Sequence, residues 1–223
     1  MKLKTLFSSA VLALGLGSVA HAATFTYNFA TNGSDVLTAS PSSATAGAPS
    51  VSVTAWSTTN FTSWTQGNVT QNGSAGMGAR THNNDSHTVD NGTRFEFLLF
   101  SFGAAVDVNS FRLGYIDGDS DYRWSVGNTS NLTTLYSTGT DGFNAPLSPS
   151  VQSINPSNIL GSYLLLGTTP NSNYDDDRFK VNQLIVDYTT PPPTQGVPDS
   201  GATLILLGLG LLGLAGLKRR MAA

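Results

Sequence analysis

Apolar and polar side chains alternate along most of this chain in short segments. The clearest is 95–102, where Phe95, Phe97 and Leu99 share one face of an extended strand. Leu98 and Phe100 supply the opposite face, which predicts a strand buried on both sides. Clusters of Gly, Asn and Pro separate such segments and mark turns. The pattern predicts strands over 24–30, 51–57, 95–102, 110–116, 123–126, 132–137, 159–166 and 180–188.

No segment between residues 23 and 189 shows a sustained helical period. About eight strands with turn punctuation predict an all-β extracellular domain over 23–189, namely an antiparallel β-sandwich of jelly-roll type. The interval 67–84 is rich in Gly and Asn, so we expect a long exposed loop there.

The N-terminus has the three parts of a secretory signal peptide. Lys2 and Lys4 precede an uncharged apolar run over 6–19, and the small residues Ala20 and Ala22 follow at the −3 and −1 positions of a peptidase site. This run is too short to span a bilayer and has no amphipathic face. We therefore predict a signal peptide over 1–22, removed by signal peptidase during export.

The C-terminus carries a second apolar segment with a basic end. A Pro-rich linker over 190–196 and a short motif over 197–201 precede the uncharged segment 202–217, which is dominated by Leu and Gly. A helix of these 16 residues is about 24 Å long, slightly less than the ~30 Å hydrocarbon core, and can insert with local thinning. Three cations follow it and should remain cytoplasmic: Lys218, Arg219 and Arg220. The pattern predicts a single transmembrane helix that anchors the precursor in the inner membrane.

This tail, over 197–223, resembles the PEP-CTERM sorting signal of exosortase-processed proteins. Its motif is Val197-Pro198-Asp199-Ser200-Gly201, followed by the Leu/Gly-rich segment and the basic cluster. The usual motif of that family is Val-Pro-Glu-Pro, so the first proline and the acidic neighbour match and the second proline does not. The resemblance implies that a membrane-embedded, cysteine transpeptidase-like exosortase cuts near the motif, and that the product reaches the cell surface or the medium.

The exported domain also resembles, loosely over most of its length, a family of exosortase-dependent surface proteins. The segments that carry this resemblance are 51–56, 87–91, 99–103, 106–108, 114–115, 119–124 and 175–181. That family is defined by its sorting tail and a β domain and has no assigned reaction, so the resemblance implies a location and no chemistry.

Charge and composition narrow the possible partners of the domain. Its cations number six and its acids thirteen, which gives about seven excess negative charges. This balance argues against nucleic acid and anionic lipid and favours cations or neutral glycans. The chain has no cysteine, which removes disulfides and thiolate chemistry.

Two acidic segments are candidates for a calcium site. Alternating aspartates occur at Asp117, Asp119 and Asp121, and a second run covers 175–177. Calcium takes six to eight oxygen ligands, and two acidic loops at one end of a sandwich can converge on one ion. Asp also suits turns that precede strands, so solvated turn residues are the alternative. The candidate ligands are Asp117, Asp119, Asp121, Asp175, Asp176 and Asp177.

Other constellations give weaker signals. His82 and His87, with Asp85 and Asp90, could hold zinc, but they lack the helical HExxH context, and local hydrogen bonds that fix a loop are the alternative. Trp64 lies in a polar context, so we expect it to be exposed and able to stack on a sugar ring.

No catalytic residue stands out. The chain has one glutamate, Glu96, within an apolar strand, and no nucleophile elbow or phosphate-binding loop. The sequence thus predicts an exported, non-enzymatic protein of the cell surface or of an exopolysaccharide matrix that requires no cofactor. A carbohydrate-binding module, with or without stabilising calcium, is the alternative, and a polysaccharide hydrolase is the third.

Overall fold

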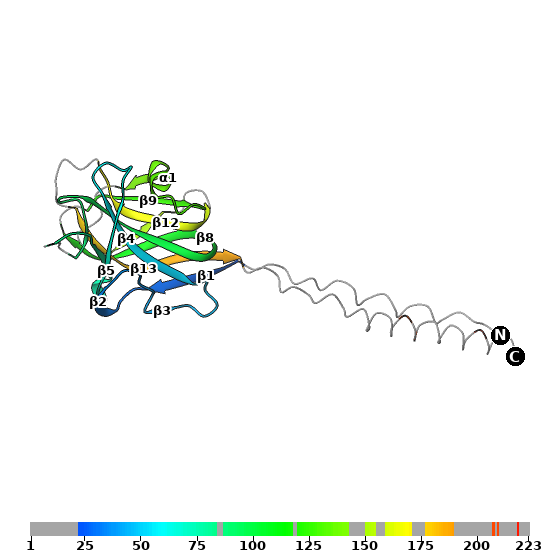
Figure 1. Ribbon diagram of the computed structural model, residues 1–223. Coiled ribbons are helices and arrows are strands. Elements are labelled where there is room, and N and C mark those ends of the chain that lie inside the picture. Colours follow the sequence, from blue (N-terminus) through cyan, green and yellow to red (C-terminus); the bar gives the residue numbers. More distant parts are fainter. Residues whose placement is uncertain are drawn as a thin grey trace. The chain divides into compact units, whose positions relative to one another are not determined.

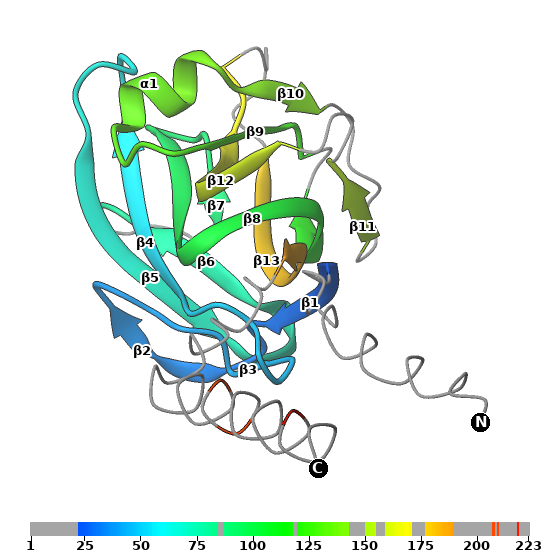
Figure 2. The same ribbon diagram turned by 90° about the vertical axis from the view of Figure 1, so that its right-hand side faces the viewer.

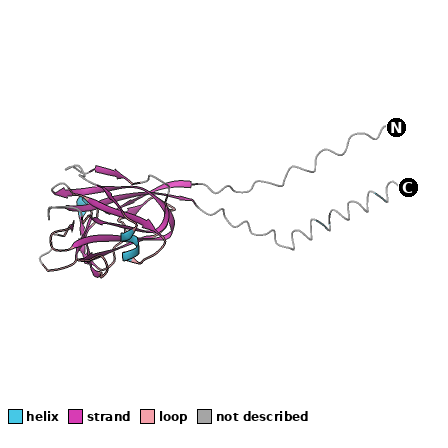
Figure 3. Cartoon of the chain, turned by 90° about the horizontal axis from the view of Figure 1, so that it is seen from above, coloured by secondary structure: helices cyan, strands magenta, loops and turns pink. Residues whose placement is uncertain are grey.

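The computed structural model describes residues 22–83, 87–117, 120–142, 150–154, 159–170 and 177–189, with Leu207, Leu209 and Lys218 as single positions. One compact unit extends over Ala22–Thr189 (Figure 1). It consists mostly of strands, with a short α-helix and a short 3-10 helix (Figure 3), which confirms the all-β prediction. The strands are β1 (Ala22–Asn28), β2 (Asn32–Val36), β3 (Ser43–Ala44), β4 (Val51–Thr58), β5 (Thr65–Asn72), β6 (Met77–Arg80), β7 (Val89–Asp90), β8 (Phe95–Asp117), β9 (Tyr122–Gly127), β10 (Thr140–Gly142), β11 (Ser150–Ser153), β12 (Leu160–Thr168) and β13 (Arg178–Thr189).

The strands form a single antiparallel sheet of 13 strands instead of the two separate sheets of the predicted jelly-roll sandwich. Its main path runs β10-β9-β12-β8-β4-β5-β6-β13-β1-β3, and β8 also pairs with β13. The pairings β8–β4, β4–β5, β5–β6, β6–β13 and β13–β8 therefore close a ring. The difference arises because β8 is long enough to belong to two parts of the sheet.

Strand β8 has 23 residues and joins two segments that the sequence predicted as separate strands. Its first part pairs with β4 and β12, and its last part pairs with β11 and β13, as the curved ribbon in Figure 2 shows. The prediction that 95–102 is buried on both faces is confirmed, since Phe97 and Phe100 both have no exposed surface.

The main hydrophobic core lies inside the ring. It combines Phe29 and Phe100, which meet edge to face at 5.6 Å, with Phe111, Leu184 and Phe179, all fully buried. Each such side chain stabilises the fold by about 1.5–3 kcal/mol through removal of apolar surface from water. The chain has no cysteine, so this core forms without a disulfide.

A second, smaller core covers the opposite face of β4, β8 and β12. It contains Phe97, Leu99 and Leu165, and the helix α1 (Leu132–Ser137) adds Leu132 and Leu135. In Figure 2, α1 lies beside β9 and β10 at one end of the sheet.

The segment 132–137 is helical, so the strand predicted there is wrong. Asn131 caps the helix, because its Oδ1 accepts a hydrogen bond from the Thr134 amide at 3.0 Å. Leu132 and Leu135 are three residues apart and both buried, which is the spacing of one helix face. Six residues are too few for periodicity to separate helix from strand.

The long loop predicted over 67–84 is also wrong in part. This interval contains most of β5, the short 3-10 helix η1 (Gly73–Ala75) and β6. Val69, Met77 and Ala79 are fully buried within it. Gly78 permits a close approach of two segments of the chain, because a Cβ there would lie 2.3 Å from the His87 carbonyl oxygen. The glycines that suggested a loop thus serve strand packing.

The described part of the chain contains no helix long and apolar enough to cross a membrane. The predicted span 202–217 is described only at Leu207 and Leu209, both exposed and helical. The signal peptide up to residue 21, the linker 190–196 and the motif 197–201 lie outside the described residues, as do Arg219 and Arg220.

Candidate functional site

The two acidic segments meet at their described ends. Asp177 immediately precedes β13 and is completely buried. Its Oδ1 accepts a hydrogen bond from the Asp121 amide at 2.6 Å, and its Oδ2 accepts one from Asn91 Nδ2 at 2.6 Å. The Asp117 carboxylate lies 3.7 Å from the Arg178 guanidinium, with which it is in register across β8 and β13. The carboxylate of Asp177 thus joins three segments through hydrogen bonds.

This arrangement accounts for Asp177 without an ion. The described residues contain no group of three or more His, Asp or Glu side chains that could hold a metal. Asp119, Asp175 and Asp176 lie outside the described residues. Calcium binding by these aspartates therefore stays a prediction.

A buried polar network occupies the start of β8. Glu96 is fully buried and lies opposite Ser57 of β4. Its carboxylate accepts hydrogen bonds from the Thr81 hydroxyl and, at 3.4 Å, from the Asp90 amide. The Thr168 hydroxyl donates to the Asp90 carbonyl at 3.3 Å. These bonds connect β7, β8, the end of β12 and Thr81, which follows β6, so the buried carboxylate of Glu96 is held by structural hydrogen bonds.

The histidines are placed around the same region. His82 Nε2 lies 3.1 Å from the Thr93 hydroxyl, and His87 has a positive φ of 62°. Thr70 donates to the His87 carbonyl at 2.9 Å, which fixes this turn against β5. Asp85 lies outside the described residues. These contacts are those of a hydrogen-bonded loop.

Trp64 is partly buried instead of exposed as predicted. Its ring meets Phe97 edge to face at 5.3 Å between centroids. Its Nε1 donates a hydrogen bond to the Thr133 hydroxyl of α1 at 3.1 Å. The polar sequence context was misleading because α1, which covers Trp64, was predicted as a strand.

Trp64 belongs to an aromatic cluster on the outer face of β4, β8 and β12. Phe61 stacks on Tyr136 with centroids 4.2 Å apart and planes 8° apart. The Thr58 hydroxyl accepts from the Phe61 amide at 2.8 Å, which holds Phe61 at φ 59°. The partly buried aromatic side chains of this face are Trp56, Phe61, Trp64, Phe95, Tyr136 and Tyr163.

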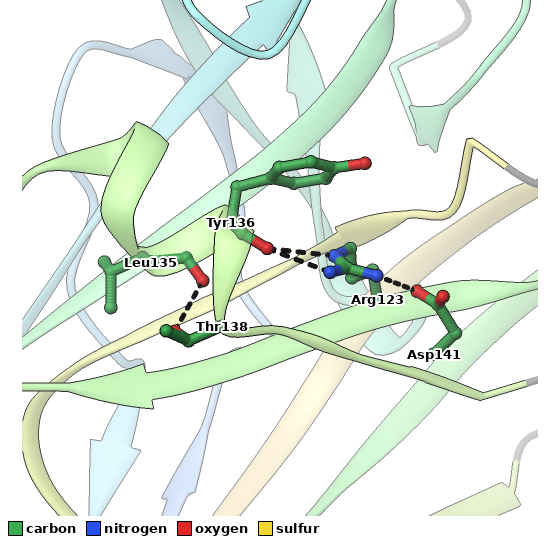
Figure 4. Close-up of polar contacts among 5 residues, drawn as sticks. All are labelled: Arg123, Leu135, Tyr136, Thr138 and Asp141. Carbon is green, nitrogen blue, oxygen red and sulfur yellow. Dashed lines mark hydrogen bonds and ion pairs between the residues drawn. The ribbon is translucent and has the colours of Figure 1, made fainter.

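Arg123 holds Tyr136, one of the aromatic residues of this cluster, in place (Figure 4). Its Nη1 lies 2.5 Å from the Asp141 carboxylate, and its Nε and Nη2 donate to the Tyr136 carbonyl at 3.2 and 3.0 Å. Its guanidinium carbon lies 4.5 Å from the Tyr136 ring centroid. Burial raises the pKa of the Tyr136 phenol; Arg123 lowers it and Asp141 raises it to a smaller extent. The phenol therefore remains a neutral hydrogen-bonding group at physiological pH.

Comparisons with known proteins identify the class of the C-terminal tail. Its tail is a PEP-CTERM-like C-terminal sorting tail, found on exported proteins that a sorting enzyme such as an exosortase processes. In particular, residues 196–221 match the family model of the VPDSG-CTERM motif. This match confirms the expected sorting tail and explains why the second proline of the usual motif is absent.

The β domain has no comparably informative relative. No curated protein matches the chain. A rhamnosidase from Klebsiella oxytoca with rhamnose bound matches at 14% identity and a TM-score of 0.33. The match covers 67% of this chain and 33% of that chain, so this chain spans about a third of the length of that enzyme. Similarity at this level defines neither the fold nor an activity.

Proposed function

We propose that this protein is a non-enzymatic component of the bacterial cell surface or of the extracellular polysaccharide matrix. In this proposal signal peptidase removes residues 1–22, the segment 202–217 anchors the precursor in the inner membrane, and an exosortase then removes the tail. The VPDSG-CTERM match over 196–221 carries the proposal. The buried, hydrogen-bonded state of Glu96 and Asp177 supports a structural role for these carboxylates.

Intact-mass measurement of the protein released from cells tests the sorting route. We expect a product that begins at or near Ala23 and lacks the segment 204–223. A matched variant, Pro198→Ala, alters the motif while leaving the apolar segment and the basic cluster intact. It should accumulate as a membrane-bound precursor. A released protein that still ends in Lys218-Arg219-Arg220 and the following residues would contradict the proposal.

The aromatic cluster favours carbohydrate binding as a second candidate function. Trp56 and Tyr163 stand on the outer face of the sheet and are only partly buried. Aromatic rings with one apolar face and one wet edge are common where proteins contact ligands. A glycan array probed with the full chain in mild detergent tests this idea. Binding should weaken in Trp56→Ala, whose melting temperature must be checked in parallel. An array without signal would remove this candidate.

A further inference from the structure

A hollow of about 310 Å³ opens on the outer surface where β8, β13 and η1 meet. The described residues that line it are Ser74 of η1, Arg112 and Gly114 of β8, and Asn182 of β13. Its volume is at the lower end of the range of small-ligand sites, about 300–1,000 Å³, and suits one sugar unit. None of these described lining residues belongs to the acidic segments or to the aromatic cluster.

Two irregularities in strand pairing form this hollow. Tyr115 pairs with Lys180 and Leu113 with Val181, so the register skips Gly114, and a second shift skips Asn182. Such bulges redirect side chains and are common beside functional sites. The exposure pattern changes phase accordingly: Arg112 is exposed, Leu113 is fully buried, and Tyr115 is 40% exposed.

The walls of the hollow are held in place. Asn182 Nδ2 donates to the Ser74 carbonyl at 2.7 Å, and the Phe29 amide donates to the Asn182 carbonyl at 2.8 Å. A Cβ on Gly114 would lie 2.4 Å from the Ala75 carbonyl oxygen, so η1 sits directly against the strand. The site thus exists before a ligand arrives, which lowers the entropy cost of binding.

Arg112 gives the hollow a positive charge that the described surroundings do not neutralise. Arg80, Arg123 and Arg178 each lie within 4.0 Å of a carboxylate. No ion pair or hydrogen bond of the Arg112 side chain with another described residue is present, and no acid is among the described lining residues. The nearby Lys180 is already engaged, because its Nζ donates to Asn72 Oδ1 at 2.9 Å.

We propose that this hollow binds a carboxylate-bearing sugar, such as a hexuronic acid unit of an acidic extracellular polysaccharide. A guanidinium presents a planar fork of donors that matches a carboxylate, and the Asn182 and Ser74 side chains provide partners for the sugar hydroxyls. The choice of a polysaccharide rests on the proposed function at the cell surface, whereas the anionic chemistry rests on Arg112.

The net negative charge of the domain affects how this binding depends on salt. Repulsion between about seven excess negative charges and a polyanion acts over long range. Salt screens such repulsion beyond about 8 Å at physiological ionic strength, while the contact with Arg112 is shorter than that distance. Binding of a short uronic acid oligomer should therefore persist between low and physiological salt, unlike binding driven by a basic surface.

Isothermal titration of the full chain in mild detergent with tri-galacturonate tests the proposal. We expect binding of tri-galacturonate and no comparable binding of its methyl-esterified form or of maltotriose. Arg112→Ala should weaken binding by about 10- to 100-fold, the loss associated with a charge-assisted hydrogen-bonded pair. Arg112→Lys should recover part of it, since the charge returns without the fork. Arg94→Ala, which removes one cation outside the hollow, is the matched control.

Several outcomes would overturn the proposal: equal affinity for the esterified oligomer, unchanged affinity in Arg112→Ala, or inorganic phosphate that competes as well as the uronic acid. The last result would make the hollow a general anion site. None of these results affects the mass of the released protein, so a failure of this inference is distinguishable from a failure of the sorting proposal.

Discussion

Asp177 shows how one buried carboxylate can organise a domain end. Its two oxygens hold the Asp121 amide and the Asn91 side chain, each at 2.6 Å. Asp177→Ala should lower the free energy of unfolding by about 3 kcal/mol, because both buried donors lose their acceptor. Asp177→Asn keeps one acceptor oxygen and should cost less. Urea denaturation of both variants measures the difference, and equal midpoints for wild type and alanine variant would refute the assigned role.

The calcium prediction concerns the neighbouring aspartates. If Asp117, Asp119 and Asp121 bind calcium, saturating calcium adds stability by mass action, about 2.7 kcal/mol at a hundredfold excess over the dissociation constant. Calorimetry should then show a melting temperature higher by several degrees, with a smaller effect of magnesium. Asp119→Ala should abolish the increase. Coincident curves with calcium, magnesium and chelator would identify these aspartates as turn residues.

Tyr27 gives the fold a sensitivity to high pH. Its hydroxyl donates to the Pro49 carbonyl at 2.6 Å, and burial raises its pKa to about 12 from 10.0. Between these values the unfolded chain loses a proton that the folded chain keeps, so stability is full below pH 10 and is lost as pH rises toward 12. Tyr27→Phe should show a shallower decline of the urea midpoint over this range. A parallel decline in both proteins would contradict this account.

At the scale of elements, α1 links the aromatic cluster to the sheet. Asn131→Ala removes its cap and should cost about 1 kcal/mol, whereas Asn131→Ser keeps an acceptor and should cost much less. Melting of both variants measures this, and the Trp64 fluorescence should report the same order because Trp64 Nε1 bonds to Thr133 of that helix. A cap variant with unchanged melting temperature would show that packing of Leu132 and Leu135 alone maintains the helix.

The same elements show what the sequence can and cannot predict. The alternation over 95–102, the first part of β8, could be recognised in the sequence because Phe97 and Phe100 fill two different cores. Its continuation past Gly103 could not be recognised, because it depends on β12, which is distant in sequence and pairs with Ser101 and Val106 on either side of that glycine. The approach of the two acidic segments could be predicted, because each segment directly precedes a strand. The position of Trp64 depended on a six-residue helix whose cap, Asn131, was the only local signal.

The bulge at Gly114 was likewise beyond sequence reasoning. Strict alternation along 110–116 places Arg112, Gly114 and Ile116 on one face. The register skip brings Tyr115 outward instead. A bulge depends on the partner strand, and here Asn182 and η1 determine it. Candidate ligand residues created by pairing irregularities therefore need a structure to be found.

At the scale of the whole molecule, the basic cluster at the C-terminus should control retention of the precursor. Replacement of Lys218, Arg219 and Arg220 by Gln removes the cations that should stay in the cytoplasm. We expect less membrane-bound precursor and a released protein that keeps its tail, measured by intact mass. Substitution of all three cations by other cations in the order Arg-Lys-Lys is the matched control and should behave as wild type.

The pairing of Ala22 with Thr189 has a mechanical consequence. Any pull transmitted through the tail enters the domain at the end of β13, which is paired with β8 along one edge and with β1, β6 and β7 along the other. To extract this strand along its own axis, many backbone hydrogen bonds must break together instead of one after another. A domain held by the end of β13 and loaded through a ligand bound at Arg112 of the neighbouring β8 would resist tension by shear between the two strands, because their backbone hydrogen bonds share the load.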